Sequence, residues 1–410
     1  MSIDTRKINK DEMYFSLKGD NFDGNVFAME AIEKGAKFSI VDDLEQKDIH
    51  DNIVYVENSL KALQDLSNHH RSLFDTKVIG ITGSNGKTTT KNLIYSILSQ
   101  KYNVIKTKGN LNNHIGVPLS LLNIKDDIDV AIIEMGANHV GEIKRLCEIA
   151  MPDIGLITNY GYAHLEGFGS FEGVIKGKTE MYEYLTENYG HIILNNDDKL
   201  QVENCKGDLA VTFGSNKDSE FIFDYKKDNS SLKLRIDGYE FNSNLFGEYN
   251  FSNLASSITI GKFLDLSNKE IQEGLNKFLN DSNRSEILIF DSNKIYLDAY
   301  NANPTSMLAA ISNFENIKIN NRVLILGDMF ELGEYSDQEH QKIVDFVTNK
   351  DYSKVYLVGD NFSKCNTDGE YFFKFSNTDE LAQSDSFKSL KNMNILVKGS
   401  RGVSLEKLFK

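Results

Sequence analysis

Cysteine is scarce in this chain, and its few cysteines do not suggest cross-links or a metal cluster. The 410 residues include three of them, Cys147, Cys205 and Cys365, which are odd in number and far apart. Disulfide frameworks and zinc sites need paired or closely spaced cysteines. We therefore expect the three side chains to be buried as small apolar residues.

Long apolar runs and positive charge are also lacking. No stretch approaches the roughly 20 apolar residues of a membrane span, and the start, MSIDTRKINKDEMYF, has no apolar run of the kind found in signal peptides. A net charge of -15 argues against nonspecific binding of nucleic acid, which normally needs a basic domain or stripe. We expect a cytoplasmic protein with no nucleic-acid partner and no insertion into a membrane.

Proline is rare too, with three residues, so domain boundaries must come from changes of pattern. From residue 77, short apolar β-branched runs alternate with helix-length segments, which predicts a parallel sheet with crossover helices. These runs are 78–82, 129–135, 154–158 and 191–195. The polar stretch at about 215–245 alternates in a way suited to antiparallel strands, and residues 59–73 are predicted to form a helix.

The last third of the chain repeats the alternation of strand and helix. The runs 322–327, 354–359 and 394–399 are apolar, each ends in glycine, and their spacing is that of a β-α unit. The predicted fold is therefore α/β with three domains. These are a small N-terminal α/β domain at 1–75, a central parallel-sheet domain with a phosphate loop at 76–284, and a C-terminal Rossmann-like α/β domain at 285–410.

The strongest local signal is a phosphate-binding pattern at 81–98, ITGSNGKTTTKNLIYSIL. Glycines let backbone N–H groups curl around an anion, the helix N-terminus adds partial positive charge, Lys87 neutralises phosphates and Thr88 can ligate magnesium. The strict Walker spacing would require glycine where the chain has Ile81. A glycine turn before a helix is the alternative, but the preceding strand, Lys87 and the three threonines favour nucleotide binding.

Two further side chains lie near the ends of the following strands. Glu134 closes the run 129–135, and His164 lies six residues beyond the run 154–158. Open α/β sheets bind ligands at the carboxyl ends of their strands, and magnesium prefers oxygen donors, so Glu134 is a candidate metal ligand beside Thr88. Read alone, Glu134 is equally a capping or surface carboxylate and His164 a structural histidine. The phosphate loop upstream favours the functional interpretation of both.

Several long segments resemble the Mur ligase family. The loop GSNGKTTT (83–90) has the short glycine spacing of Mur ligases and folylpolyglutamate synthetases, and the segments that follow resemble the Mur central domain in order: NLNNHIGVPLSLL (110–122), EMGANHVGEI (134–143) and NYGYAHLEGFGS (159–170). DAYNANPTSM (298–307) and LGDMFELGE (326–334) are similar to the branch of the family that adds D-alanyl-D-alanine. DTRKINKDEMYFSLKGDNFDG (4–24) resembles that branch's nucleotide-sugar domain, and VKGSRGVSLEKL (397–408) its C-terminus.

This resemblance implies a three-substrate ligation. ATP phosphorylates the terminal carboxylate of UDP-N-acetylmuramoyl-tripeptide, and the amine of D-alanyl-D-alanine attacks the acyl phosphate, which forms an amide and releases phosphate. A carboxylate is a poor electrophile, and phosphorylation supplies a leaving group, so catalysis is mostly positioning and charge neutralisation. The resemblance also implies two Mg²⁺ ions, a carbamylated lysine and a monomer.

The resemblance assigns roles to individual residues by their motif positions. It implies nucleotide contacts for Gly83, Ser84, Asn85, Gly86, Lys87, Thr88, Thr89, Asn250, Asn253, Arg284, Asp298 and Tyr300. It implies catalytic roles for Lys87, His164 and Lys178, and magnesium ligation by Thr88, Glu134, His164 and carbamylated Lys178. It implies sugar-nucleotide contacts for Thr5, Arg6, Asn112, Asn113 and Ser170, and dipeptide contacts for Asn301 and Asn303.

For some of these residues, the sequence read without the resemblance suggests a different role. A bare ammonium at Lys178 would repel magnesium, whereas a carbamate supplies anionic oxygens, yet the sequence alone makes Lys178 a solvated helix lysine with Lys176 close by. The family usually has histidine where this chain has Tyr249, which affects the expected stacking on the base. The segment 4–6 reads alone as a simple turn, and Lys398 with Arg401 either reaches substrate or forms a solvated pair.

Other functions and one conformational expectation stay open. The rivals are a related ligase for another amino acid or for folate, a nucleotide-dependent binding protein without ligation, and a small-molecule kinase that leaves a stable phosphorylated product. The third residue of the tripeptide, diaminopimelate or lysine, is not readable. Sites spread over three domains imply closure that keeps water from the acyl phosphate. We expect the ligand-free protein to be open, with the last domain swung away.

Overall fold

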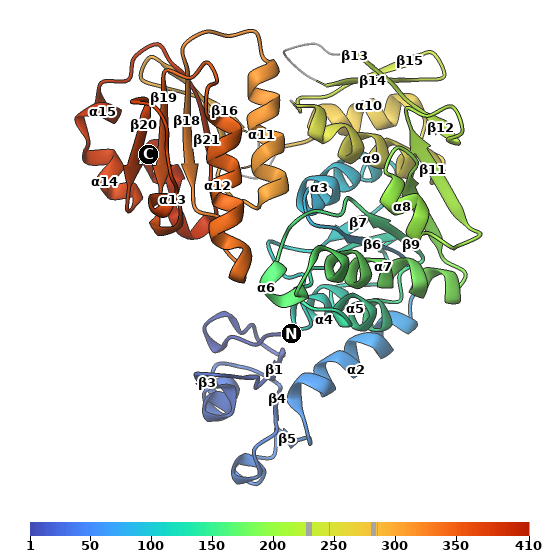
Figure 1. Cartoon of the computed structure of the whole chain (residues 1–410). Coiled ribbons are helices and arrows are strands. Elements are labelled where there is room, and N and C mark those ends of the chain that lie inside the picture. The colour runs from blue at the N-terminus through green and yellow to red at the C-terminus, as the bar shows by residue number, and fades with distance from the viewer. Residues whose placement is uncertain (227–231, 246, 280–283, 285, 410) are drawn as a thin grey trace.

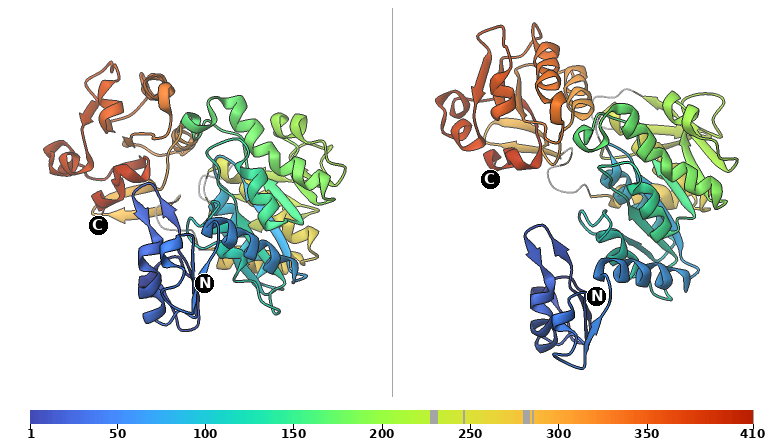
Figure 2. Two further views of the ribbon diagram at one scale, coloured as in Figure 1. Left: turned by 90° about the horizontal axis from the view of Figure 1, so that it is seen from below. Right: turned by 60° about the horizontal axis from the view of Figure 1, so that its bottom comes forward.

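The chain folds into three α/β domains in sequence order (Figure 1), as predicted. The structure is a computed structural model that describes residues 1–226, 232–245, 247–279, 284 and 286–409. Both views of Figure 2 show the N- and C-terminal domains on one side of the central domain. The predicted boundaries at 75 and 284 remain predictions, and residue 285, the first of the predicted third domain, lies outside the described residues.

The N-terminal domain is built on a parallel sheet with the strand order β1-β4-β5. Its strands are β1 (Met13–Phe15), β4 (Phe38–Val41) and β5 (Ile53–Tyr55), with a hairpin of β2 (Lys18–Gly19) and β3 (Phe22–Asp23). Its helices are η1 (Thr5–Lys7), η2 (Gly24–Phe27), α1 (Ala28–Glu33), η3 (Leu44–Gln46) and α2 (Ser59–Ser72). The helix predicted at 59–73 is α2, which Asn58 caps by accepting a hydrogen bond from the N–H of Lys61.

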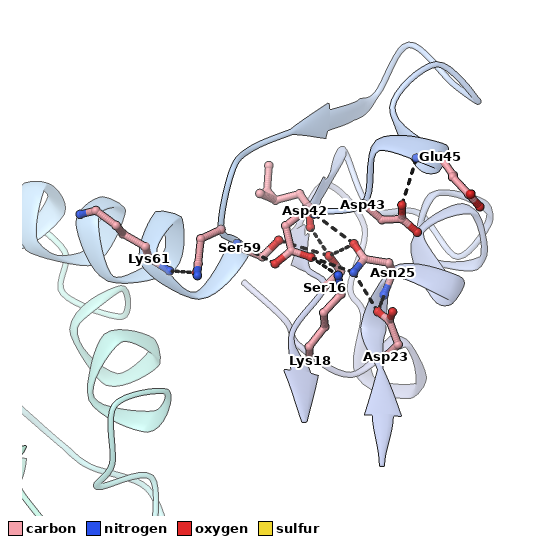
Figure 3. Close-up of polar contacts among 11 residues, drawn as sticks. Ser16, Lys18, Asp23, Asn25, Asp42, Asp43, Glu45, Ser59 and Lys61 are labelled. Carbon is pink, nitrogen blue, oxygen red and sulfur yellow. Dashed lines mark hydrogen bonds and ion pairs between the residues drawn. The ribbon is translucent and has the colours of Figure 1, made fainter. Parts of the chain in front are cut away.

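A buried polar network fixes the first turn of α2 to this sheet (Figure 3). The Asn25 side chain is fully buried, donates to Asp23 and Asp42 at 2.8 and 2.9 Å, and accepts from the Ser16 hydroxyl at 2.7 Å. The Asp42 carboxylate in turn accepts from the N–H of Ser59 at 3.2 Å. Burial alone would raise the pKa of Asp42, but these hydrogen bonds and the Lys18 ammonium outweigh it, so the pKa is lowered and Asp42 is ionised at neutral pH.

Substituting Asn25→Ala is expected to destabilise this domain by about 1–3 kcal/mol, because it leaves buried partners without hydrogen bonds. The measurement is hydrogen exchange of the backbone amides of β1 and β4, which reports local opening in a protein of several domains. Asn9→Ala is the matched control, because Asn9 is exposed and its side chain makes one hydrogen bond, 3.3 Å long, to Glu12. Equal exchange in the two variants would show that the network contributes nothing to stability.

The central domain has a parallel sheet with the strand order β12-β11-β10-β9-β6-β8-β7. Its strands are β6 (Lys77–Thr82), β7 (Val104–Lys106), β8 (Val130–Glu134), β9 (Ile154–Ile157), β10 (His191–Asn195), β11 (Ala210–Gly214) and β12 (Phe221–Ile222). Its helices are α3 (Lys87–Leu98), α4 (Gly116–Leu121), α5 (Glu142–Ala150), α6 (Leu165–Phe168), α7 (Phe171–Glu187), α8 (Lys199–Asn204), η4 (Glu248–Asn250), α9 (Phe251–Phe263) and α10 (Asn268–Lys277). The four apolar runs predicted as strands are β6, β8, β9 and β10.

Both faces of this sheet are covered, which explains why its strands are apolar without interruption. Successive side chains of a strand point to opposite faces, so Ile79 and Ile81 pack with α3 and α9, whereas Val78 packs with α5 and α7. The predicted antiparallel strands are β13 (Asp224–Lys226), β14 (Lys233–Ile236) and β15 (Tyr239–Asn242), with residues 227–231 outside the described part. Figure 1 shows them at the side of the domain where α10 lies.

The C-terminal domain has the strand order β16-β17-β21-β18-β19-β20, in which β16 is antiparallel to β17 and the other pairs are parallel. Its strands are β16 (Glu286–Phe290), β17 (Asn293–Asp298), β18 (Arg322–Gly327), β19 (Lys354–Val358), β20 (Phe372–Phe375) and β21 (Asn394–Lys398). Its helices are α11 (Pro304–Asn316), η5 (Gly333–Tyr335), α12 (Ser336–Val347), α13 (Asp360–Lys364), α14 (Thr378–Gln383), α15 (Asp385–Lys388), η6 (Arg401–Val403) and η7 (Leu405–Phe409). The three predicted apolar runs are β18, β19 and β21.

The C-terminal domain lies against the central domain. The Asn303 side chain donates to Oδ1 of Asn85 at 2.8 Å, and Thr305 Oγ1 accepts from the N–H of Tyr162 at 3.0 Å. One apolar cluster of buried side chains also includes residues of both domains. The expectation that the ligand-free protein is open stays a prediction, which small-angle scattering with and without ligands would test.

Two expectations from composition can be compared with the structure. Cys147 and Cys365 are buried as expected, while Cys205 is only half-buried, and all three are free thiols. Within the described residues, no helix has the length and apolar character that crossing a membrane requires.

Candidate active site

The phosphate loop joins β6 to α3, and its glycines are required by close packing. Gly83 and Gly86 have φ angles of 140° and 82°, which residues with side chains rarely adopt. A Cβ at Gly83 would lie 1.9 Å from the Thr158 hydroxyl oxygen, and one at Gly86 would lie 2.4 Å from Oδ1 of Asn253. The chain therefore has no room for another residue at either position, whatever ligand is bound.

Residues that follow β9 hold the loop in shape. The backbone carbonyl of Asn85 accepts from the Thr158 hydroxyl at 2.6 Å and from the Asn159 side chain at 3.0 Å. The Asn85 N–H donates to Oδ1 of Asn159 at 3.1 Å, and the Ser84 hydroxyl donates to the Gly161 carbonyl at 3.0 Å. The loop is thus held by bonds within the protein, which reduces the ordering that anion binding requires.

Lys87 lies in the first turn of α3 and folds back over the loop. Its ammonium donates to the Gly83 carbonyl at 2.6 Å. Burial lowers the pKa of Lys87, the nearby Glu134 carboxylate opposes that shift, and the Arg284 guanidinium adds to it. A bound phosphate could replace the carbonyl as the partner of this ammonium.

Glu134, at the end of β8, is surrounded by donors. Its carboxylate is 3.1 Å from the Thr88 hydroxyl and 2.9 Å from the Asn112 amide nitrogen, and it forms an ion pair with Lys91 at 2.9 Å. Burial would raise the pKa of Glu134, but Lys91, Lys87 and the Asn112 hydrogen bond together lower it, so the group is anionic.

Lys91 was missed in the sequence, although it lies one helical turn after Lys87 on the same face of α3. It is almost fully buried, at 2% exposure, and its ion pair with Glu134 is buried on both sides. The spacing of four residues from Lys87 was the signal in the sequence that could have pointed to Lys91.

Lys87, Thr88 and Glu134 line one cavity of about 970 Å³ between the central and C-terminal domains. Among the residues predicted from the sequence, the cavity is lined by Ser84, Asn85, Gly86, Lys87, Thr88, Thr89, Asn112, Asn113, Glu134, His164, Asn250, Asn253, Arg284, Asp298, Tyr300 and Asn301. The fold therefore brings most of the predicted nucleotide and metal residues to one place. Their individual roles stay predictions.

The predicted adenine pair is also part of the scaffold. The Asn253 side chain donates to Oδ1 of Asn250 at 3.0 Å and accepts from the Thr90 hydroxyl at 3.1 Å, so it connects α9 to α3. Both asparagines are buried. Tyr249, which stands where the family usually has histidine, lines the cavity next to them, so an aromatic ring is available there.

On the C-terminal side of the cavity, predicted residues make two cation–π contacts and one ion pair. The Arg284 guanidinium lies 3.7 Å from the centre of the Tyr300 ring, and that of Arg401 lies 5.4 Å from it. Lys398 is 2% exposed and forms an ion pair with Asp298 at 2.7 Å. The alternative of a solvated Lys398 and Arg401 pair is therefore wrong for Lys398, because its ammonium fixes the carboxylate that was predicted to bind the ribose.

The two lysines of α7 differ sharply in their surroundings. Lys176 is exposed, whereas Lys178 is 1% exposed and its ammonium lies 5.3 Å from the centre of the Phe168 ring. Burial and the charge of Lys87 hold the pKa of Lys178 well below its usual value. Its ammonium forms no ion pair with any carboxylate of the described residues. The reading of Lys178 as a solvated helix lysine is therefore wrong, although Lys178 does not itself line the cavity.

His164 begins α6 with a left-handed backbone (φ 55°) and lines the cavity. Its Nδ1 contacts the carboxylate of Glu331, which comes from the C-terminal domain and lines the same cavity. Contact with His164 lowers the pKa of Glu331, so that carboxylate is anionic. Glu331 lies in a segment that the resemblance had singled out, but no role had been predicted for it.

Besides Lys178, five predicted residues lie outside the lining of this cavity. The Thr5 hydroxyl donates to Glu30 at 3.0 Å, and Arg6 forms an exposed ion pair with Asp4 at 2.8 Å, both within the N-terminal domain. Ser170 caps α7 by accepting from the N–H of Gly173. Gly83 lies in the phosphate loop and packs closely against Thr158. Asn303 caps α11 and contacts Asn85.

The residues present fit a magnesium ion at one position. The Thr88 hydroxyl and the Glu134 carboxylate lie 3.1 Å apart, so both can ligate one ion, and Mg²⁺ commonly takes its remaining ligands from phosphates and water. Across the described ranges no group of three or more His, Cys, Asp or Glu side chains could hold a metal by itself. A second ion at His164 would therefore need oxygens that an unmodified Lys178 does not have.

Three family models match consecutive parts of the chain. The model described as Mur ligase family, catalytic domain, matches residues 1–71, and that of the Mur ligase middle domain matches residues 81–261. The model described as Mur ligase, glutamate ligase domain, matches residues 283–401. The order of the three models along the chain is the order of the three domains.

Relatives and solved structures match over the full length. The UDP-N-acetylmuramoyl-tripeptide–D-alanyl-D-alanine ligases of Bacillus subtilis (strain 168) and Escherichia coli (strain K12) are each 33% identical to the chain, covering 100% of it and 92% of their own length. MurF from Acinetobacter baumannii has a TM-score of 0.90 at 28% identity and covers 99% of this chain and 91% of its own. MurF ligase from Thermotoga maritima in complex with ADP has a TM-score of 0.87 at 26% identity, covering 99% and 95%.

Proposed function

The chain belongs to the Mur ligase family, and on that premise we propose that it joins D-alanyl-D-alanine to UDP-N-acetylmuramoyl-tripeptide, with conversion of ATP to ADP and phosphate. The product is UDP-N-acetylmuramoyl-pentapeptide, a precursor of peptidoglycan. The observation that carries this proposal is the 33% identity, over the full chain, to the ligase of that name from Bacillus subtilis. We further propose that the protein acts as a monomer in the cytoplasm.

The phosphate loop would hold ATP through its backbone N–H groups and the N-terminus of α3. Lys87 would neutralise the phosphoryl group that moves to the carboxylate, and Arg284, whose charge acts on Lys87, would add a second positive charge. Thr88 and Glu134 would hold one magnesium ion, which supplies charge neutralisation between the phosphates when it is bound. Asp298, fixed by Lys398 at 2.7 Å, would accept a ribose hydroxyl.

Lys178 is proposed to carry a carbamate. An uncharged amine attacks carbon dioxide: a bond forms between Nζ and carbon, one C=O π pair moves onto oxygen, and a proton passes from nitrogen to water. The lowered pKa of Lys178 and its lack of an ion-pair partner among the described residues favour the uncharged amine, whereas Lys176 is exposed. The carbamate and His164 would together hold the second magnesium ion.

The remaining substrate contacts follow the division of the chain. The sugar nucleotide would bind across the N-terminal domain, through Thr5 and Arg6, and the central domain, through Asn112, Asn113 and Ser170. The dipeptide would bind at Asn301 and Asn303, next to the phosphate loop that Asn303 contacts through Asn85. Its amine would then lie near the carbonyl carbon of the acyl phosphate.

The test is phosphate release in the presence of ATP, magnesium, UDP-N-acetylmuramoyl-tripeptide and D-alanyl-D-alanine, with each omitted in turn. We expect release to require all of them and to match the formation of pentapeptide measured by mass spectrometry. Diaminopimelate- and lysine-containing tripeptides should be compared in the same assay. If a single amino acid replaced the dipeptide, the family would stand but the proposed substrate would not; a stable phosphorylated product would favour a kinase.

A further inference from the structure

A contact between two domains reaches a residue of the proposed active site. The segment 328–335, between β18 and α12, lies against the segment 164–169 of the central domain. There the Glu331 carboxylate contacts Nδ1 of His164, and the Glu331 carbonyl accepts from the N–H of Glu166 at 3.3 Å. Glu331 and His164 both have left-handed backbones, with φ of 62° and 55°. Because two strained residues meet at this contact, we expect the contact to have a function.

The Glu331 segment is held rigidly by its own domain. The Asp328 carboxylate accepts from the N–H groups of Asn361 and Phe362, both at 2.9 Å, at the start of α13. The imidazole of His340, fully buried, accepts from the N–H of Met329 at 2.9 Å and donates to the Ser336 carbonyl at 2.7 Å. The backbone on both sides of Glu331 is therefore fixed, and its carboxylate has a defined position.

The facing surfaces leave little freedom for another arrangement. A Cβ at Gly333, where φ is 54°, would lie 3.3 Å from Glu166, and the Tyr335 hydroxyl donates to the Gly169 carbonyl at 3.2 Å. The two segments thus meet in one register, which brings Glu331 to His164 and to no other imidazole of the described residues.

We propose that Glu331 is a positioning residue for the ligation reaction, and that it orients His164 only when the C-terminal domain is docked. A carboxylate against Nδ1 fixes the orientation of the imidazole ring and favours the tautomer with hydrogen on Nδ1, which would leave Nε2 for a ligand in the cavity. The carboxylate and the imidazole belong to different domains. Docking of the C-terminal domain therefore brings Glu331 to His164 and completes the group of residues proposed to act in phosphoryl transfer. This inference rests on the proposed function.

The test compares Glu331→Ala and Glu331→Gln with the matched control Glu334→Ala, whose carboxylate is exposed in the same segment. Loss of a carboxylate that orients a ligating histidine typically reduces activity by about 10–100-fold. We expect Glu331→Ala to lower kcat by about that factor with little change in KM for any substrate. Glu331→Gln should recover part of the loss, because its amide oxygen still accepts from Nδ1–H, and Glu334→Ala should resemble the wild type.

Two further measurements separate positioning from mere docking. In a His164→Ala background, Glu331→Ala should have no additional effect on kcat. With ¹⁵N-labelled histidine, the His164 signal should report the Nδ1–H tautomer in the wild type and a mixture in Glu331→Ala, without substrates. A raised KM with unchanged kcat, additive effects, or an unchanged tautomer would overturn the inference. An inactive wild type would instead count against the proposed function.

Discussion

Replacing Lys87 with methionine is expected to lower kcat of ligation by about a hundredfold to a thousandfold or more, since one preorganised donor at a reacting group commonly contributes that much. Lys87 lies over the phosphate loop, with its ammonium 2.6 Å from the Gly83 carbonyl, and in the proposed reaction it neutralises the phosphoryl group in transit. The loop itself is held by Thr158 and Asn159, so it should keep its shape in the variant.

The measurement is phosphate release under saturating substrates, together with the dissociation constant of ATP from a direct binding titration. The affinity for ATP should fall much less than kcat, because the loop N–H groups remain. Lys101→Met, which alters an exposed lysine that hydrogen-bonds the Asp265 carbonyl, is the control. A Lys87→Met enzyme with more than about a tenth of wild-type turnover would contradict a role in phosphoryl transfer.

Replacing Lys178 with methionine is expected to abolish ligation and, in buffer free of bicarbonate and magnesium, to raise the melting temperature. Lys178 is 1% exposed without an ion-pair partner among the described carboxylates, so folding must either bury its charge or deprotonate its amine, and both cost free energy. Methionine has a similar length and no charge, so the substitution should raise the free energy of unfolding by about 1–3 kcal/mol. Loss of the carbamate removes the ligand oxygens, which should reduce turnover by at least about a hundredfold.

Lys176→Met is the control for both measurements, because Lys176 lies on the same helix and is exposed. It should match the wild type in turnover and in melting temperature. Activity of the wild type should also fall when carbon dioxide is removed and return with bicarbonate, whereas Lys178→Met should not respond. A Lys178→Met protein that ligates normally would exclude the carbamate, and one that melts at lower temperature would mean that Lys178 contributes to the fold.

Features encoded within one segment could be predicted from the sequence. The strands β6, β8, β9 and β10 are uninterrupted apolar runs because helices cover both faces of the sheet. The phosphate loop was equally visible, since its glycines, Lys87 and Thr88 lie within a few residues. The position of Glu134 beside Thr88 followed from strand order at the carboxyl edge of the sheet.

Features that depend on how distant segments meet could not be predicted. Lys178 looks solvated on the helix, and only the packing of Phe168 and its neighbours shows that it is buried. The contact of Glu331 with His164 requires the docking of two domains, which no local pattern encodes. The hydrogen bonds of Asn303 and Thr305 across the same interface could not be predicted either, because they also join distant segments.

The attachment of the N-terminal domain has a consequence for substrate length. Asp42 ties the sheet to the first turn of α2, and apolar side chains around Leu63 of α2 pack with Leu119 and Leu122 of the central domain. If the sugar nucleotide binds there as proposed, this attachment would set the distance between the sugar and the phosphate loop. A peptide one residue shorter would then leave its carboxylate about 3.5 Å short of the phosphoryl donor, so the length of the acceptor would contribute to its selection.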